Sequence, residues 1–167
     1  GQPDFASKHA VDTSRIILVG HCYGGAMAFN YAARHPEIRH VILLEPVEPG
    51  EFARAYLGNS RLAAILDSAF DSMKRPGGPV NFGGKEDLRT MVQNPKPYDL
   101  LLNAPKVADR NILLVTGWDD FTTTTEGHHL PLYRSLKKAG AKQVKLLALH
   151  TDHGFRKVRE QLADEVI

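Results

Sequence analysis

The stretch Gly20-His-Cys-Tyr-Gly-Gly25 decides the fold, because it follows directly on the apolar run Arg15-Ile-Ile-Leu-Val19 and opens a segment with helical spacing. A cysteine with glycine two residues before and two residues after it is typical of a sharp turn from a strand into a helix, with a nucleophile at its tip. We expect a strained backbone at Cys22, so the residues at these two positions must lack side chains for strand and helix to approach. Such a turn points the thiol over the carboxyl edge of a sheet.

Cys22 is the only cysteine among the 167 residues, so no internal disulfide can form. A thiol at the start of a helix lies near the positive end of the helix dipole, which favours the reactive thiolate. The backbone N–H of Tyr23 is then a candidate donor of an oxyanion hole. The alternative is that Cys22 is a small buried apolar residue, as many lone cysteines are. The flanking glycines, strand and helix favour the nucleophile.

Four short apolar runs predict a parallel sheet with helices between its strands. Continuous apolar runs of this length are typical of strands buried on both faces. We expect strands at 15–19, 40–44, 111–115 and 143–149, and helices at 24–35, 126–139 and 154–167. This order gives a single α/β domain over 1–167 with right-handed crossovers. The stretch 46–109 is too long for an ordinary crossover, so we interpret it as a lid-like helical excursion, with helices at 52–73 and 85–93.

Candidate acid and base residues follow the third and fourth predicted strands. The order expected along the chain after such a turn is nucleophile, acid, base. Asp119 and Asp120 follow the third strand, and His153 follows the fourth, which brings them to the edge where Cys22 points. His153 would take the thiol proton, and the acid would hold the imidazole. Asp119 can instead cap the next helix, and Glu45 at the end of the second strand is a further candidate acid.

A metal site is a weaker hypothesis for the same region. His128, His129, His150, His153 and Asp152 could gather there, but no two of the histidines have the four-residue helical spacing of zinc enzymes. We therefore predict no metal and no other cofactor. His21 and Trp118, beside the expected nucleophile and acid, are candidate substrate-binding residues.

These segments resemble the α/β-hydrolase superfamily, within it the bacterial dienelactone-hydrolase and prolyl-oligopeptidase-like branch. The resemblance rests on the turn with its flanking elements (14–46), the acid turn (115–120), the helix at 126–141 and the base turn (149–155). It implies a catalytic triad of Cys22, His153 and Asp120, because the acid of this family usually stands three residues after the glycine that ends its strand. Cysteine as nucleophile is similar to the dienelactone hydrolases, whereas the rest of the chain is more similar to the peptidase-type esterases.

The resemblance implies hydrolysis of a carboxylic ester, lactone or thioester through an acyl-enzyme intermediate, with a small acyl compound as substrate. Ester cleavage is favoured over peptide cleavage, because amide leaving groups need stronger protonation. Two alternatives stay open: a peptidase-like hydrolase in which Cys22 replaces serine, and an inactive binding module.

The resemblance also predicts a partial fold. The superfamily sheet normally has eight strands with the nucleophile turn after the fifth, whereas here the turn is reached by residue 22. We therefore expect the N-terminal strands and the second oxyanion donor to be missing. The first strand would then carry an open edge, which would be covered by self-association or by a complementary N-terminal chain.

Charge and composition exclude two further classes of partner. The chain holds 21 Lys and Arg against 19 Asp and Glu, and the basic residues are scattered, so no nucleic-acid surface is predicted. No segment reaches the roughly 18 apolar residues of a membrane-spanning helix. The single cysteine fits a reducing cytoplasm.

Overall fold

The computed structural model describes residues 8–9, 12, 15–74 and 83–166. At its centre lie the strands β1 (Ile17–His21), β2 (His40–Leu44), β3 (Asn111–Gly117) and β4 (Val144–Leu149), in that order across one sheet. All three neighbouring pairs are parallel. The predicted α/β fold and its four apolar strands are therefore confirmed, with end shifts of one or two residues. Because the strands are parallel, their carboxyl ends share one edge of the sheet.

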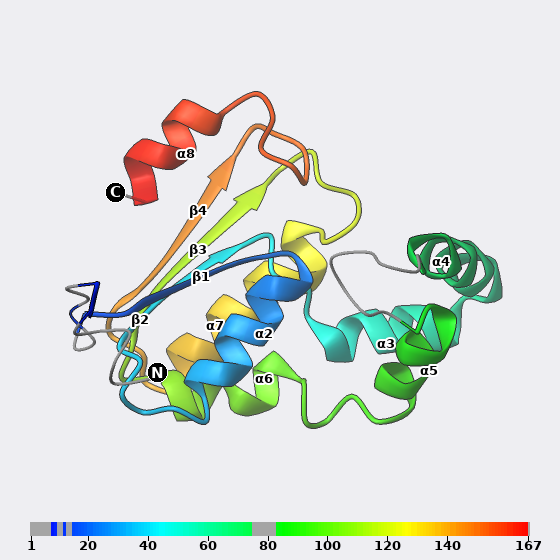
Figure 1. Cartoon of the computed structure of the whole chain (residues 1–167), viewed down its shortest axis with the longest axis horizontal. Helices are drawn as coiled ribbons and strands as arrows, with labels where there is room; N and C mark the ends of the chain where they lie inside the picture. Colours follow the sequence, from blue (N-terminus) through cyan, green and yellow to red (C-terminus); the bar gives the residue numbers. More distant parts are fainter. Residues whose placement is uncertain (1–7, 10–11, 13–14, 75–82, 167) are drawn as a thin grey trace.

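Helices cover both faces of the sheet (Figure 1). The helices α2 (Tyr23–Ala32), α6 (Leu100–Asn103) and α7 (Leu130–Lys138), with the 3-10 turn η1 (Ala104–Val107), lie on one face, and α8 (Arg159–Val166) lies on the other. The main core fills the space between the first group and the sheet. Its buried members include Ala26, Phe29, Leu43, Leu114, Leu132 and Leu136.

The helix predicted at 126–139 begins as the π turn η2 (Thr125–His129) and continues as α7. Pro131 lies in the first turn of α7, where a missing backbone N–H costs no helical hydrogen bond. At the other end Gly140 takes a φ of 89°, and the Ala141 N–H donates to the Leu136 carbonyl at 3.0 Å. This pair of features is the glycine cap that helix ends favour, and it agrees with the capping position predicted for Gly140.

The excursion between β2 and β3 contains α3 (Pro49–Gly58), α4 (Ser60–Met73) and α5 (Lys85–Gln93), which pack on one another beside the sheet layers (Figure 1). The single helix predicted at 52–73 is wrong, because Asn59 divides it. Asn59 is extended, and its side chain accepts the Leu62 N–H at 3.0 Å, which caps α4.

The helix predicted to begin at Gly154 begins only at Arg159. Phe155 has a φ of 53°, a left-handed conformation that a continuous helix does not allow. Its buried ring packs against Val115 and Leu149, together with Leu162 of α8. The base turn is therefore anchored to the sheet by Phe155 instead of being part of a helix. Ile167 lies outside the described residues.

β1 forms one edge of the described sheet, as the open first strand was predicted to do. Ile17 and Val19 on this strand are each 55% exposed. None of the helices in the described residues is long and apolar enough to cross a membrane.

Candidate active site

The nucleophile turn places Cys22 in a strained backbone conformation, with φ 55° and ψ −124°. The Cys22 N–H donates to the Leu44 carbonyl at 2.9 Å, and the Cys22 carbonyl accepts from Gly25 at 3.0 Å and from Val47 at 3.3 Å. These bonds tie the turn to the end of β2. The thiol itself is partly exposed at the carboxyl edge of the sheet.

Two glycines let strand and helix approach, and only one of them is among the two that the sequence predicts. A Cβ on Gly20 would lie 2.2 Å from the Gly24 carbonyl oxygen, so the glycine before Cys22 is required. A Cβ on Gly24 would meet nothing within 4 Å. The close approach after Cys22 is made by Gly25, where a Cβ would lie 3.0 Å from the Pro46 Cβ. The expectation for Gly24 is therefore wrong, because the first turn of α2 points its position into open space.

Asp120 and His153 meet at the carboxyl ends of β3 and β4. The Nδ1 of His153 donates to the Asp120 Oδ2 at 2.6 Å. Burial opposes the charge on Asp120, yet the hydrogen bonds from His153, the Thr123 hydroxyl and the Thr122 N–H outweigh it and hold the Asp120 pKa below its usual range. The Thr123 hydroxyl donates to the same Oδ2 at 2.6 Å. Thr123 is thus a further partner of Asp120 that local sequence patterns did not identify.

The charge on His153 follows from its two partners. The hydrogen bond to Asp120 is the largest cause, and an interaction with the Cys22 sulfur is the second; together they raise the pKa of His153 to about 10. Its imidazole is therefore protonated at neutral pH. A cationic ring beside a thiol stabilises the thiolate.

The structure separates the rival candidate acids. Asp119 is exposed, and its backbone N–H donates to the Thr151 carbonyl at 3.1 Å. It is Asp120 that contacts His153. Glu45 is buried nearby, so that among the described residues Glu45, Asp120 and His153 offer oxygen or nitrogen atoms within 4.8 Å of one another.

Of the four histidines proposed for a metal site, only His153 is in that group. The Nδ1 of His128 accepts the Glu48 N–H at 3.0 Å, and the Nε2 of His129 donates to the Pro46 carbonyl at 3.1 Å. These ring nitrogens therefore bond to the backbone, which leaves no shared cluster with His150 and Asp152 within the described chain.

The remaining candidates surround the same edge. The His21 Nε2 donates to the His153 carbonyl at 2.8 Å, and the two ring centroids are 4.7 Å apart, so His21 holds the base turn. Trp118 is half exposed directly after β3. Tyr23 is the first residue of α2, where a backbone N–H has no partner within the helix.

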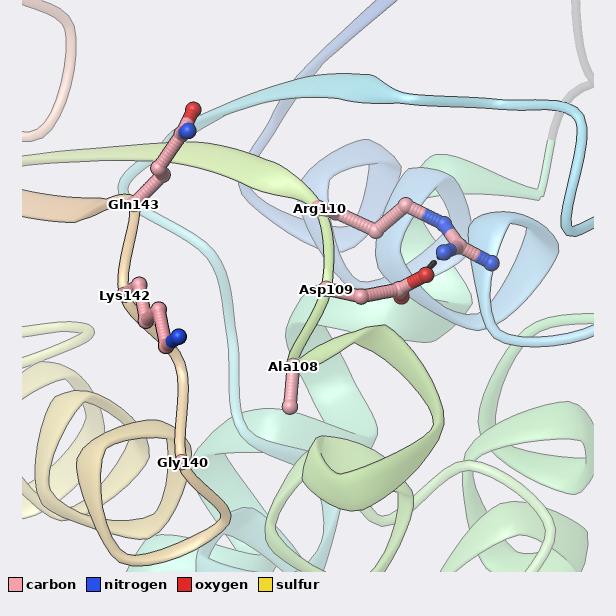
Figure 2. A pocket seen from close by; sticks show the side chains of 6 residues that line it. All are labelled: Ala108, Asp109, Arg110, Gly140, Lys142 and Gln143. Atoms are coloured by element: carbon pink, nitrogen blue, oxygen red, sulfur yellow. Dashed lines mark hydrogen bonds and ion pairs between the residues drawn. The ribbon is translucent and has the colours of Figure 1, made fainter.

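A pocket of about 390 Å³ lies at the opposite end of the sheet (Figure 2). The residues that line it directly precede β3 and β4, and Arg110 there pairs with Asp109. Figure 2 shows both side chains pointing away from Lys142 and Gln143. None of the candidate catalytic residues lines this pocket.

Comparison with known proteins finds one family and several solved structures. Residues 5–90 match the family model of the alpha/beta hydrolase fold. An esterase from Pyrococcus furiosus is 15% identical, with a TM-score of 0.61 over 97% of this chain and 54% of its own. An acylaminoacyl peptidase from Pyrococcus horikoshii is 20% identical, with a TM-score of 0.62 over 92% of this chain and 22% of its own. A Klebsiella pneumoniae protein assigned as a dienelactone hydrolase is 15% identical, with a TM-score of 0.53 over 91% and 46%.

At these identities the likeness to solved structures concerns the fold alone. This chain spans between about a fifth and about half of the length of these three structures. No curated protein matches the sequence.

Proposed function

Because the chain belongs to the alpha/beta hydrolase fold family, we propose that it is an acyl hydrolase in which Cys22 attacks a carboxylic ester, lactone or thioester. The observation that carries this proposal is the 2.6 Å bond between His153 and Asp120 at the edge where the strained turn holds Cys22. Nucleophile, base and acid also follow one another in the order typical of this fold.

In the proposed reaction His153 starts as the imidazolium, since its pKa is raised to about 10, and the Cys22 sulfur attacks as a thiolate. The thiolate sulfur forms a bond to the carbonyl carbon, and the oxyanion accepts the Tyr23 N–H. The carbon–oxygen or carbon–sulfur bond of the substrate then breaks, and the leaving group takes the proton of His153. The product of this half-reaction is a thioester on Cys22 with a neutral imidazole beside it.

Hydrolysis of the thioester restores the starting state. Neutral His153 takes a proton from water, the hydroxide attacks the acyl carbon, and the Cys22 thiolate leaves. Asp120 accepts from His153 throughout and stabilises the ring each time it is charged. His153 ends protonated, so the cycle balances with one water consumed.

A strongly held proton on His153 favours esters over amides. The tetrahedral adduct of a thiolate expels that thiolate again unless the competing group is protonated. An amine must gain a proton before it leaves, whereas an alkoxide or thiolate leaves with partial protonation. The raised pKa of His153 makes it a weak proton donor. Peptide cleavage is therefore the second candidate, suggested by the fold of the acylaminoacyl peptidase.

The test compares a p-nitrophenyl acyl ester with a p-nitroanilide of the same acyl group. We expect ester turnover, an acyl adduct on Cys22 by mass spectrometry, and loss of both in Cys22→Ala with unchanged circular dichroism. Comparable anilide cleavage would favour a peptidase. Turnover that survives in Cys22→Ala would refute the nucleophile. A folded chain with neither turnover nor rapid alkylation of Cys22 would be a binding module.

A further inference from the structure

Glu45 is a second carboxyl group beside the acid–base pair, and the proposed chemistry does not use it. It directly follows β2, has a φ of 45°, and is 0% exposed. Its backbone N–H donates to the Val115 carbonyl at 2.8 Å, which fixes it against β3. Buried carboxyl groups are rare unless their hydrogen bonds are satisfied, so the partners of Glu45 define what it does.

One oxygen of Glu45 holds the turn that carries Asp120. Oε1 accepts the Gly117 N–H, three residues before Asp120. A Cβ on Gly117 would lie 2.8 Å from this oxygen and 2.3 Å from the Thr151 carbonyl oxygen. Gly117 of the acid turn thus packs between the Glu45 carboxyl group on one side and the base turn on the other.

The hydrogen bonds of the second oxygen indicate that Glu45 is neutral. The Pro46 carbonyl can only accept, so the Nε2 of His129 carries a proton. In a neutral His129 the Nδ1 is then an acceptor, and the Thr116 hydroxyl donates to it at 2.6 Å. The Thr116 hydroxyl has one proton, which the shorter 2.6 Å bond to His129 takes, and its 2.9 Å bond to the Thr125 hydroxyl can be donated by Thr125. A hydrogen bond at the 3.3 Å contact between Thr116 and the Glu45 Oε2 then needs a proton on Glu45.

In the alternative arrangement Glu45 gives its proton to the Thr116 hydroxyl, and that hydroxyl gives its own proton to the Nδ1 of His129. Glu45 and His129 would then form an ion pair, with 3.6 Å between Oε2 and Nε2. Both side chains are 0% exposed, and burying two charges costs more than burying the neutral pair. Burial raises the pKa of Glu45 to about 8 and lowers the pKa of His129 to about 4, so both shifts favour the neutral arrangement.

We propose that Glu45 is a positioning residue, which holds the acid turn as a neutral carboxylic acid and leaves Asp120 as the carboxylate that faces His153. This inference rests on the proposed function of the site. The charged or titratable groups that face Glu45 are Asp120 on the acid turn, His153 on the base turn and His129 on η2.

The variant Glu45→Gln tests whether the wild-type residue acts as a neutral acid or as a carboxylate, because glutamine can replace only the neutral form. Glu45→Gln keeps an oxygen that accepts the Gly117 N–H and gains an NH₂ that donates to Thr116, so kcat should stay within about twofold of the wild type. Glu45→Ala loses both bonds, and kcat should fall about tenfold with little change in KM. Asp120→Asn serves as the reference for a required carboxylate, with a loss of about 10²- to 10⁴-fold. Loss in Glu45→Gln as large as in Asp120→Asn would overturn the proposal, even if Glu45→Ala does not fold.

A second readout does not depend on turnover. An unfolded glutamate ionises near pH 4.3, whereas folded Glu45 has a pKa raised to about 8. The contribution of neutral Glu45 to the free energy of unfolding is therefore complete below about pH 4, and it is lost as the pH rises through 8. The difference between the urea midpoints of Glu45→Gln and the wild type should grow from pH 5 to pH 8.

The two readouts fail independently. A pH-dependent difference in a chain without ester turnover would refute the proposed function and leave the neutral Glu45 standing. A constant difference in an active enzyme would refute the neutral Glu45 alone.

Discussion

Cys22 combines a strained backbone with several backbone hydrogen bonds. A non-glycine residue at a φ of 55° and ψ of −124° costs of order 1–3 kcal/mol. The Cys22 carbonyl compensates by accepting N–H groups from Gly25, Ala26 and Val47. These partners come from α2 and from the chain after β2. The position of the thiol is therefore set before any substrate arrives, as preorganised catalysis requires.

The adjacent residues Asp119 and Asp120 provide a matched pair of variants at the residue scale. The hydrogen bond to Asp120 is the largest cause of the raised pKa of His153, so Asp120→Asn should lower that pKa from about 10. The stability that the charged ring contributes is full below its unfolded pKa near 6.5 and is lost as pH rises through 10. Asp120→Asn should reduce this loss, and the part due to Cys22 should remain.

Two-dimensional NMR of the His153 ring measures the shift directly. Asp119→Asn is the control, since Asp119 is exposed and only its backbone bonds to the base turn. Equal titration of His153 in the two variants would contradict the assignment of Asp120.

The sequence predicted the three main candidates of this site but not the network around them. Cys22 and His153 follow strands that the length and flanking residues of the apolar runs predicted, and the family resemblance favoured Asp120 over Asp119. Glu45 was recognised as a candidate acid, while its neutral state depends on Thr116 and His129. Those residues are 71 and 84 positions away along the chain, so no local pattern could reveal their hydrogen bonds.

At the scale of elements, prediction succeeded where burial alone determines structure. Strands buried on both faces leave continuous apolar runs, and these were located to within two residues. The start of α8 was missed because the left-handed Phe155 carries no glycine or asparagine signal. The helix division at Asn59 had a local signal, since asparagine before serine is a favoured start of a helix.

Gly20 and Gly24 belong to the same turn between β1 and α2, but we expect opposite effects when each is replaced by alanine. Gly20→Ala places a Cβ 2.2 Å from the Gly24 carbonyl oxygen, so strand and helix must separate, and the free energy of unfolding should fall by about 3 kcal/mol. Gly24→Ala meets open space on α2 and should raise it by about 0.5 kcal/mol, because alanine favours helix over glycine. Urea denaturation measures both. Similar losses in the two variants would show that the glycines share one packing role.

At the scale of the molecule, the excursion holds a second, smaller core. Its buried side chains come from α3 and α5. The Tyr56 hydroxyl and the Arg89 guanidinium both donate to Asp67, each at 2.6 Å, which links the three helices of the excursion. The helices α3, α4 and α5 therefore share a core of their own, which Phe52 joins to the main core by packing against both. A core of its own allows this group of helices to differ in stability from the sheet.

The last prediction concerns β1, the edge strand of the described sheet. An edge strand presents backbone groups that pair readily with another strand. In the part of the chain that the structure describes, no strand pairs with the outer side of β1, and Ile17 and Val19 are each 55% exposed. We propose that two copies of the chain pair through β1 about a two-fold axis, which makes the new strand pair antiparallel.

Sedimentation velocity should show a concentration-dependent dimer, and Val19→Lys should shift it to monomer because lysine on an edge strand opposes pairing. Leu102→Lys is the control, since Leu102 on α6 is 60% exposed and lies away from β1. A dimer that resists Val19→Lys, or one that Leu102→Lys dissociates equally well, would assign the contact to another surface. A wild-type chain that stays monomeric as its concentration rises would show that the β1 edge does not associate with itself.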